Sequence, residues 1–82
     1  MPAVTYVYML QSQQLASAQY VGLTEDLDAR LVWHNHGSVP STRNLRPWRI
    51  KTAVMFTDVA RARAFERYLK TGSGRAFAKK HF

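Results

Sequence analysis

The 82-residue chain contains no cysteine, which excludes a disulfide framework, a thiolate metal site and a thiol nucleophile. Acidic residues are scarce, with five Asp plus Glu against twelve Lys plus Arg and a formal net charge of +7. No apolar run approaches the roughly 20 residues of a membrane span, and the first seven residues lack the positive charge of a secretory signal. These absences predict one small cytoplasmic domain, residues 1–82, that has no membrane partner and is held together by packing alone.

The positive charge is concentrated in the second half of the chain. Residues 1–42 carry a net charge of −2, whereas residues 43–82 carry +9. A concentrated positive surface attracts polyanions, chiefly nucleic acid, through phosphate contacts and counterion release. A basic surface that is merely solvated has the same composition, so charge alone leaves both interpretations open.

Residue patterns predict three strands. An alternating run of β-branched and aromatic residues over 4–10 is typical of a strand, and residues 19–23 form a second one, close enough to pair with the first as an antiparallel hairpin. Residues 48–56 predict a third strand. Strict alternation there places Ile50, Thr52, Val54 and Phe56 on one face.

Capping residues delimit the helices. Thr24 is placed to cap a helix over 25–36 that stops at Gly37, and Asp58 is placed to cap a helix from Val59 to about Thr71, ended by Gly72. A short helix from Ser73 or Gly74 to His81 follows. The long loop over 37–47 is rich in turn formers, which is typical of a functional or mobile loop. The order β-β-α-β-α-α predicts an α+β fold, a three-stranded sheet flanked by helices.

Glu66 is the only acid after Asp58 and lies in a strongly basic stretch. It sits at the edge of an apolar helical stripe made of Val59, Ala62, Phe65 and Leu69. Two roles compete. Glu66 could be an ion-pair partner of Arg63, Lys70 or Arg30, which spacing alone favours, or the single carboxylate that a nucleic-acid-bound Mg²⁺ needs.

Arg30 and His34 form an i, i+4 pair on one side of the first predicted helix. The strands beside it carry Tyr6, Tyr8 and Tyr20, each of which could equally be a half-buried core residue. His34 and His36 are poorly spaced to share a metal ion, so we expect no zinc site. These residues are suggestive of a site but do not define one singly.

Taken together, the residues follow a family pattern. Its elements in this sequence are Tyr6-Val7-Tyr8, Tyr20-Val21-Gly22, Arg30, His34, Ser41-Thr42-Arg43, Arg46-Pro47-Trp48 and the stretch from Phe65 to Lys70. In order and spacing they resemble the GIY-YIG nuclease domain, and most of all its small stand-alone bacterial members related to the nuclease module of the UvrC excision-repair protein. The resemblance covers Val4 to Lys80 and implies a three-stranded antiparallel sheet flanked by helices, in agreement with the pattern above.

The resemblance also implies a reaction, the hydrolysis of DNA phosphodiesters by water with one Mg²⁺ or Mn²⁺ ion. It makes Glu66 the metal ligand and Arg30 the residue that stabilises charge on the scissile phosphate. Tyr8 or Tyr20 would deprotonate or orient the water, assisted by His34. Because a free tyrosine has a pKa near 10, a basic role requires the positive field of Arg30 and the metal to lower it.

Further residues are assigned to the DNA backbone or depart from the pattern. We expect contacts to DNA from Thr42, Arg43, Arg46, Arg49, Lys51, Lys70, Lys79 and Lys80. The first motif is Tyr6-Val7-Tyr8 rather than Gly-Ile-Tyr, which a strand should accept. Many catalytic members carry an asparagine where this chain has Ala78, so positioning of the substrate could fall to the neighbouring lysines.

The sequence thus predicts a GIY-YIG endonuclease acting in DNA repair or recombination, on DNA that is branched or damaged. With no specificity domain predicted in these residues, we expect recognition of DNA shape or recruitment by a protein partner, and a monomer or weak dimer. The rival prediction is a non-catalytic nucleic-acid-binding module on the same fold.

Overall fold

The computed structural model describes residues 3–82 and has the predicted α+β order. Its elements are β1 (Thr5–Ser12), β2 (Gln19–Thr24), α1 (Leu27–Asn35), the 3-10 helix η1 (Arg43–Leu45), β3 (Trp48–Phe56), α2 (Val59–Leu69) and α3 (Gly72–His81). The strands form one antiparallel sheet in the order β2-β1-β3, so that β1 is central and β2 lies at an edge. Among the described residues, no helix is long and apolar enough to cross a membrane.

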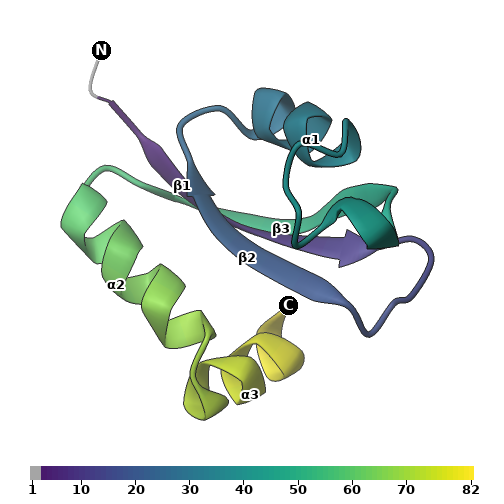
Figure 1. The fold of residues 1–82 in the computed structure, drawn as a ribbon. Coiled ribbons are helices and arrows are strands. Elements are labelled where there is room, and N and C mark those ends of the chain that lie inside the picture. Colours follow the sequence, from purple (N-terminus) through teal and green to yellow (C-terminus); the bar gives the residue numbers. More distant parts are fainter. Residues whose placement is uncertain (1–2) are drawn as a thin grey trace.

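Helices cover both faces of this sheet (Figure 1). One core, between the sheet and the α2–α3 pair, is built on Val7, Met9, Ala62 and Leu69. The other, on the α1 side, is built on Tyr8, Leu10 and Trp48, with Leu27 and Leu31 of α1 packed against them. Successive β1 residues therefore serve opposite cores, as the two-residue period of a strand requires.

A bulge in β3 corrects one predicted feature of the sheet. The register of β1 with β3 shifts between Met9 and Leu10, whose partners are Thr52 and Ile50. The intervening residue, Lys51, is extra, as in a β-bulge, and it interrupts the alternation. Ile50 consequently packs in the α1-side core, while Phe56 packs in the α2–α3 core, so the prediction that both share a face is wrong.

The helix caps are partly as predicted. Asp58 caps α2, accepting from the backbone N–H groups of Ala60 and Arg61. The first helix starts later than expected because Asp26, not Thr24, is its cap, accepting from the N–H of Ala29. In the α2–α3 corner Thr71 caps α3, accepting from the N–H of Gly74, so that Gly72 starts a helix and does not end one.

Two further details of the α2–α3 pair depend on tertiary packing. Val59, predicted as part of the apolar stripe, is half exposed, while Ala62 and Leu69 are buried. Gly74 packs so tightly against the end of α2 that an added Cβ would lie 1.8 Å from the carbonyl oxygen of Tyr68. The corner therefore needs a residue without a side chain at this position.

Gly74→Ala should lower the free energy of unfolding by about 1–3 kcal/mol, because the backbone at the end of α2 must move to admit the methyl group. Gly72→Ala is the matched control, since no atom lies within 4 Å of its added Cβ, and it should be neutral or slightly stabilising through helix propensity. Urea unfolding of both variants checks this. Equal stability of the two proteins would contradict the packing of the corner.

Candidate active site

Tyr8 links the two tyrosine motifs across the sheet. It lies on the central strand, is 2% exposed, and is paired in register with Gly22 of β2. Its ring lies directly over this glycine, because a Cβ added to Gly22 would be 2.5 Å from the Tyr8 hydroxyl oxygen. Gly22 is therefore the residue that makes room for the phenol.

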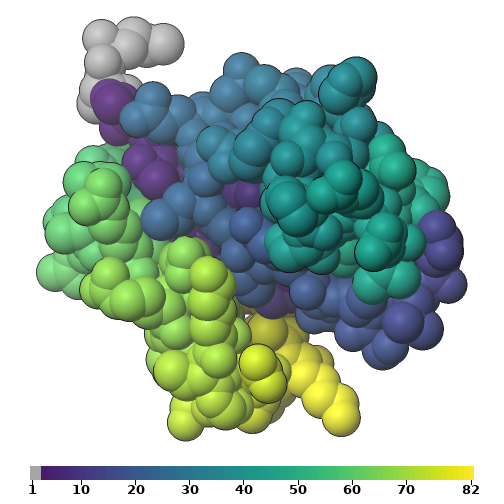
Figure 2. All heavy atoms as spheres, in the orientation of Figure 1, coloured from purple at the N-terminus to yellow at the C-terminus, as the bar shows by residue number. Residues whose placement is uncertain are grey.

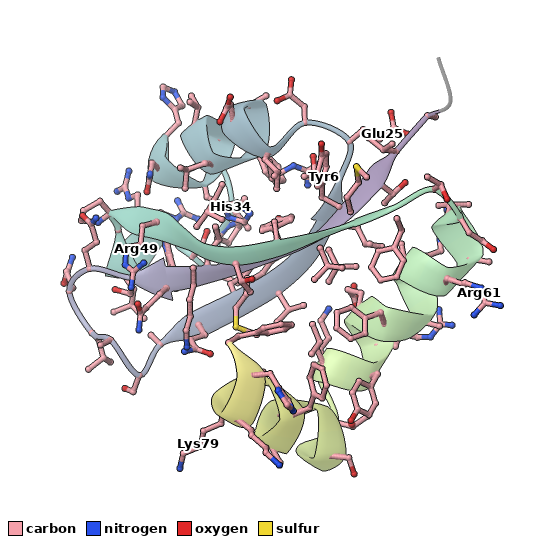
Figure 3. All side chains as sticks on the ribbon, turned by 180° about the vertical axis from the view of Figure 1, so that it is seen from behind. Tyr6, Glu25, His34, Arg49, Arg61 and Lys79 are labelled. Carbon is pink, nitrogen blue, oxygen red and sulfur yellow. The ribbon has the colours of Figure 1, made fainter. Side chains whose placement is uncertain are left out.

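His34 holds the Tyr8 hydroxyl from the other side. Its ring is buried between α1 and the sheet (Figure 3). Nε2 lies 2.9 Å from the Tyr8 hydroxyl oxygen, and Nδ1 lies 3.0 Å from Oγ1 of Thr42. Because the Thr42 hydroxyl donates to the Val39 carbonyl at 3.4 Å, its oxygen is free to accept from Nδ1–H. This network assigns the proton to Nδ1 and leaves Nε2 to accept from Tyr8.

Buried and partly buried hydrogen bonds hold the loop after α1 in place. The indole N–H of Trp48 donates to the Thr42 carbonyl at 2.7 Å. Asn35, at the end of α1, accepts from the Trp48 backbone N–H at 2.6 Å and donates to its carbonyl at 3.0 Å. These bonds tie α1 and the loop to the start of β3, so the position of Thr42 is fixed by the fold.

Thr42 itself is 1% exposed. The Thr42 hydroxyl is turned inward and bonded to His34, an arrangement that gives no support to the expected contact with DNA. The contact was predicted because Thr42 is a polar residue in a loop rich in arginine. This pattern does not indicate whether the side chain points inward or outward.

Tyr20 and Arg30 complete the cluster around Tyr8. The Tyr20 ring centroid is 6.2 Å from that of Tyr8 and 4.8 Å from that of His34, edge to face. The Arg30 guanidinium lies 4.6 Å from the ring centroid of Trp33, and its charge acts on both Tyr8 and His34. Four of the five predicted catalytic residues thus meet in one place.

The electrostatics of the cluster favour neutral side chains. Burial raises the pKa of Tyr8 to about 12, with Tyr20 and Glu66 adding to the rise and the positive charge of Arg30 opposing it. Burial and the Arg30 charge lower the pKa of His34 below its usual 6.5. Arg30 by itself does not lower the pKa of Tyr8 below its usual value, since loss of hydration outweighs the attraction of one arginine.

Glu66 approaches the cluster from α2. Its side chain is 16% exposed and its Oε1 lies 3.1 Å from Nζ of Lys70. Its charge makes the smallest contribution to the raised pKa of Tyr8. Of the two sequence interpretations, the ion pair is present, with Lys70 as the partner. It does not exclude the other, because the partner ammonium is more than half exposed and such pairs are weak.

The donor set of Glu66 suits one hard cation. Within residues 3–82, no three His, Asp and Glu side chains gather closely enough to hold a metal ion by themselves. Mg²⁺ does not need such a cage, because it takes one or two carboxylates and completes its shell with water and phosphate oxygens. A single, partly exposed carboxylate next to the cation Lys70 therefore fits Mg²⁺ or Mn²⁺ once phosphate oxygens complete the shell.

Basic residues line a groove on the α2–α3 side of the sheet. The groove has a volume of about 760 Å³ and is bordered by Tyr20 and by four cations, Lys51, Lys70, Arg75 and Lys79. Three of these were predicted to contact DNA. Arg75 was not singled out, and the signal that could have identified it is its place one helical turn before Lys79.

The remaining predicted DNA contacts lie elsewhere. Arg43 and Arg46 border a shallower hollow with Asn35 and Pro47, Arg49 bonds Gln11 across the sheet, and Lys80 is exposed on α3. Ala78, for which the family resemblance implies asparagine, is buried in the α2–α3 core and also lines the basic groove. Lys79 beside it is exposed and extends outward from α3 (Figure 3).

Thr42→Val should lower the free energy of unfolding by about 1–3 kcal/mol, because it leaves the buried Nδ1–H of His34 without an acceptor. Thr42→Ser keeps the hydroxyl and is the matched control. Nitrogen-15 NMR of the imidazole should show Nδ1 protonated in the native protein and in Thr42→Ser, and a changed tautomer balance in Thr42→Val. An unchanged tautomer in Thr42→Val would contradict the assigned network.

The lowered pKa of His34 makes stability depend on pH. Below pH 6.5, His34 is protonated in the unfolded chain but still neutral in the folded protein. The free energy of unfolding should therefore decrease as the pH is lowered, by at most about 1.4 kcal/mol per pH unit, until the lowered folded-state pKa is reached. Urea unfolding between pH 7.5 and 5.5 measures the slope. His36→Gln, which alters an exposed histidine, should keep the dependence of unfolding free energy on pH that His34 contributes. His34→Gln should lose this dependence. Loss in His36→Gln and retention in His34→Gln would contradict the assignment of the dependence to His34.

Comparison with known proteins agrees with this geometry. No curated protein matches the sequence significantly. The family model described as the GIY-YIG catalytic domain matches residues 4–80, which include both tyrosine motifs, the α1 pair and Glu66. With this match over nearly all of its residues, and with the predicted sheet and helix order present, the chain belongs to the GIY-YIG family of nuclease domains.

Proposed function

We propose that this protein is a metal-dependent endonuclease that hydrolyses phosphodiester bonds of branched or damaged DNA, in repair or recombination. The observation that carries the proposal is the meeting of Tyr8, Tyr20, Arg30 and His34 at one point of the sheet. Glu66, on α2, acts on Tyr8 through its charge. Tyr8 and Tyr20 also pack in the α1-side core, so the cluster serves the fold as well as the proposed site.

Arg30 is the residue that we assign to the scissile phosphate. Within residues 3–82, its guanidinium is the cation whose charge acts on both Tyr8 and His34. The planar fork of N–H donors suits the oxygens of a phosphoryl group and is already in place before charge develops on them.

The proton from the attacking water is proposed to pass along the buried line from Tyr8 to His34. As the water oxygen bonds to phosphorus, the water proton goes to the Tyr8 oxygen and the Tyr8 proton goes to Nε2 of His34. The bond from phosphorus to the leaving 3′ oxygen breaks, and that oxygen takes a proton from solvent. The relay never requires a free Tyr8 anion, which is consistent with a pKa of about 12.

The neutral state of His34 supports its role as the final acceptor. A lowered pKa keeps the imidazole unprotonated at neutral pH, and Thr42 accepts from Nδ1–H whether the ring is neutral or charged. Tyr20, whose ring packs on His34 at 4.8 Å, is then left to orient the water or the sugar.

Glu66 would hold the metal ion. Bound Mg²⁺ or Mn²⁺ supplies a Lewis acid that stabilises negative charge on the phosphate and on the leaving oxygen. The Glu66 carboxylate must part from Lys70 to bind it, and Lys70 is then available to a phosphate in the basic groove beside it.

The basic groove supports DNA as the substrate. Lys51, Lys70, Arg75 and Lys79 border it, and Tyr20 connects it to the tyrosine and histidine cluster. Contacts of such cations with the phosphate backbone hold a DNA strand without recognising its base sequence. We therefore propose selection by DNA structure, or by a protein partner that delivers the enzyme.

A second function has its own support. The ion pair between Glu66 and Lys70 and the raised pKa of Tyr8 are also what a non-catalytic nucleic-acid-binding module would have. Such a module would use the same groove and would leave the phosphodiester intact.

Nicking of supercoiled and branched DNA in Mg²⁺ or Mn²⁺ separates the two functions. Glu66→Ala and Arg30→Ala should each lower the cleavage rate by about 100-fold or more, with DNA binding retained by Glu66→Ala. The matched controls are Glu25→Ala and Arg61→Ala, which remove an exposed acid and an arginine that points away from the sheet (Figure 3), and both should cleave normally.

The outcomes are distinct. Binding without cleavage by the native protein would favour the binding module. Equal cleavage by the native protein and by both site variants would mean that the activity belongs to a contaminant or to another site. For the native enzyme, the rate should also fall as pH drops below the usual histidine range, because protonated His34 cannot accept the proton from Tyr8.

A further inference from the structure

Trp33 is an exposed aromatic residue that the proposed mechanism does not use. The chain has two tryptophans. Trp48 is 4% exposed and lies in a core, whereas Trp33 is 43% exposed. A large indole ring left in water contributes little to folding, and aromatic rings at the surface often mark binding positions.

The rotation of α1 places Trp33 on the side of the candidate site. Asn35 faces β3, because its amide bonds the Trp48 backbone. Trp33, two residues earlier, is turned by about 200° around the helix, away from β3, and Arg30 lies one turn before it. In the order β2-β1-β3, the side away from β3 is the side of β2 and Tyr20.

Contacts of the ring agree with this direction. The Arg30 guanidinium lies over the indole at 4.6 Å from its centroid, and the ring centroid of His34 is 5.4 Å away in an edge-to-face arrangement. Trp33 therefore adjoins the residue assigned to the scissile phosphate. In Figure 2, atoms of β2 are visible between the α1 side and the α2 side of the molecule, so this part of the sheet faces solvent.

We infer that Trp33 is a stacking platform for an unpaired nucleobase next to the scissile phosphate, an inference that rests on the proposed nuclease site. A base is separated from its own phosphate by one sugar, so a phosphate at Arg30 brings the adjoining base to the Trp33 ring. Bases within a duplex are already stacked on both faces, whereas an unpaired base has a face to offer and stacks on aromatic side chains.

The positive charge around Trp33 indicates which kind of ligand binds there. The guanidinium on the indole and the net charge of +7 disfavour a cationic partner and suit a polyanion that carries aromatic groups. A nucleotide at the junction between paired and unpaired DNA meets both requirements. The substrate is therefore DNA with a single-stranded branch, and cleavage falls beside the branch point.

The test compares binding of a flap-bearing duplex with that of a fully paired duplex of the same sequence, in EDTA so that no strand is cut. The native protein should prefer the flap, and Trp33→Leu should weaken flap binding by about tenfold with little effect on the duplex. Trp33→Phe, which keeps an aromatic ring, should retain most of the preference. Val32→Ala, at the more exposed neighbouring position, is the matched control and should behave as native.

Intrinsic fluorescence provides a direct readout. Because Trp48 is buried, quenching of tryptophan emission by the flap DNA should come from Trp33 and should disappear in Trp33→Phe. Persistence of the quenching in that variant would overturn the inference. So would an equal loss of flap and duplex binding in Trp33→Leu, because the indole would then act only by holding Arg30.

The binding test is independent of catalysis. If the flap preference depends on Trp33 but the native protein cuts no DNA in Mg²⁺ or Mn²⁺, the platform stands and the nuclease function fails. If the protein cuts DNA through Glu66 and Arg30 while Trp33→Leu binds and cuts flap and duplex like the native protein, the nuclease function stands and the platform fails.

Discussion

The buried hydrogen-bond line from Tyr8 through His34 to Thr42 is the constraint on which the site depends. Its two ends belong to the central strand and to the loop after α1, and its middle is a fully buried imidazole. Each polar atom in such a line must find a partner, because an unpaired one would cost about 1–3 kcal/mol. The line therefore fixes the height of α1 above the sheet and the tautomer of His34 together.

The same constraint accounts for features that look unrelated in sequence. Gly22 is needed because the phenol lies over its Cα. The long loop needs Trp48 and Asn35 to hold Thr42 in place. Burial that protects the line also raises the pKa of Tyr8 and lowers that of His34, so the chemistry available is proton transfer between neutral groups.

Outside this buried line the site is open and charged. Glu66 and Lys70 pair on the surface of α2 beside a basic groove, where water and phosphate oxygens can compete with the ion pair. Arg30 lies between the two environments, with its charge felt by Tyr8 and its guanidinium resting on the exposed ring of Trp33. A phosphate bound there would meet the buried Tyr8–His34 line on one side and exposed cations on the other.

Local signals in the sequence were sufficient for the order of strands and helices, the Asp58 cap, and the placement of Arg30 and His34 on one helix face, because these depend on side-chain periodicity and capping chemistry. They also sufficed for the family. Local signals could not show the bulge at Lys51, the inward turn of Thr42 or the direction of the Tyr8 pKa shift. These three depend on strand register and on burial, which arise only when segments distant in the sequence pack together.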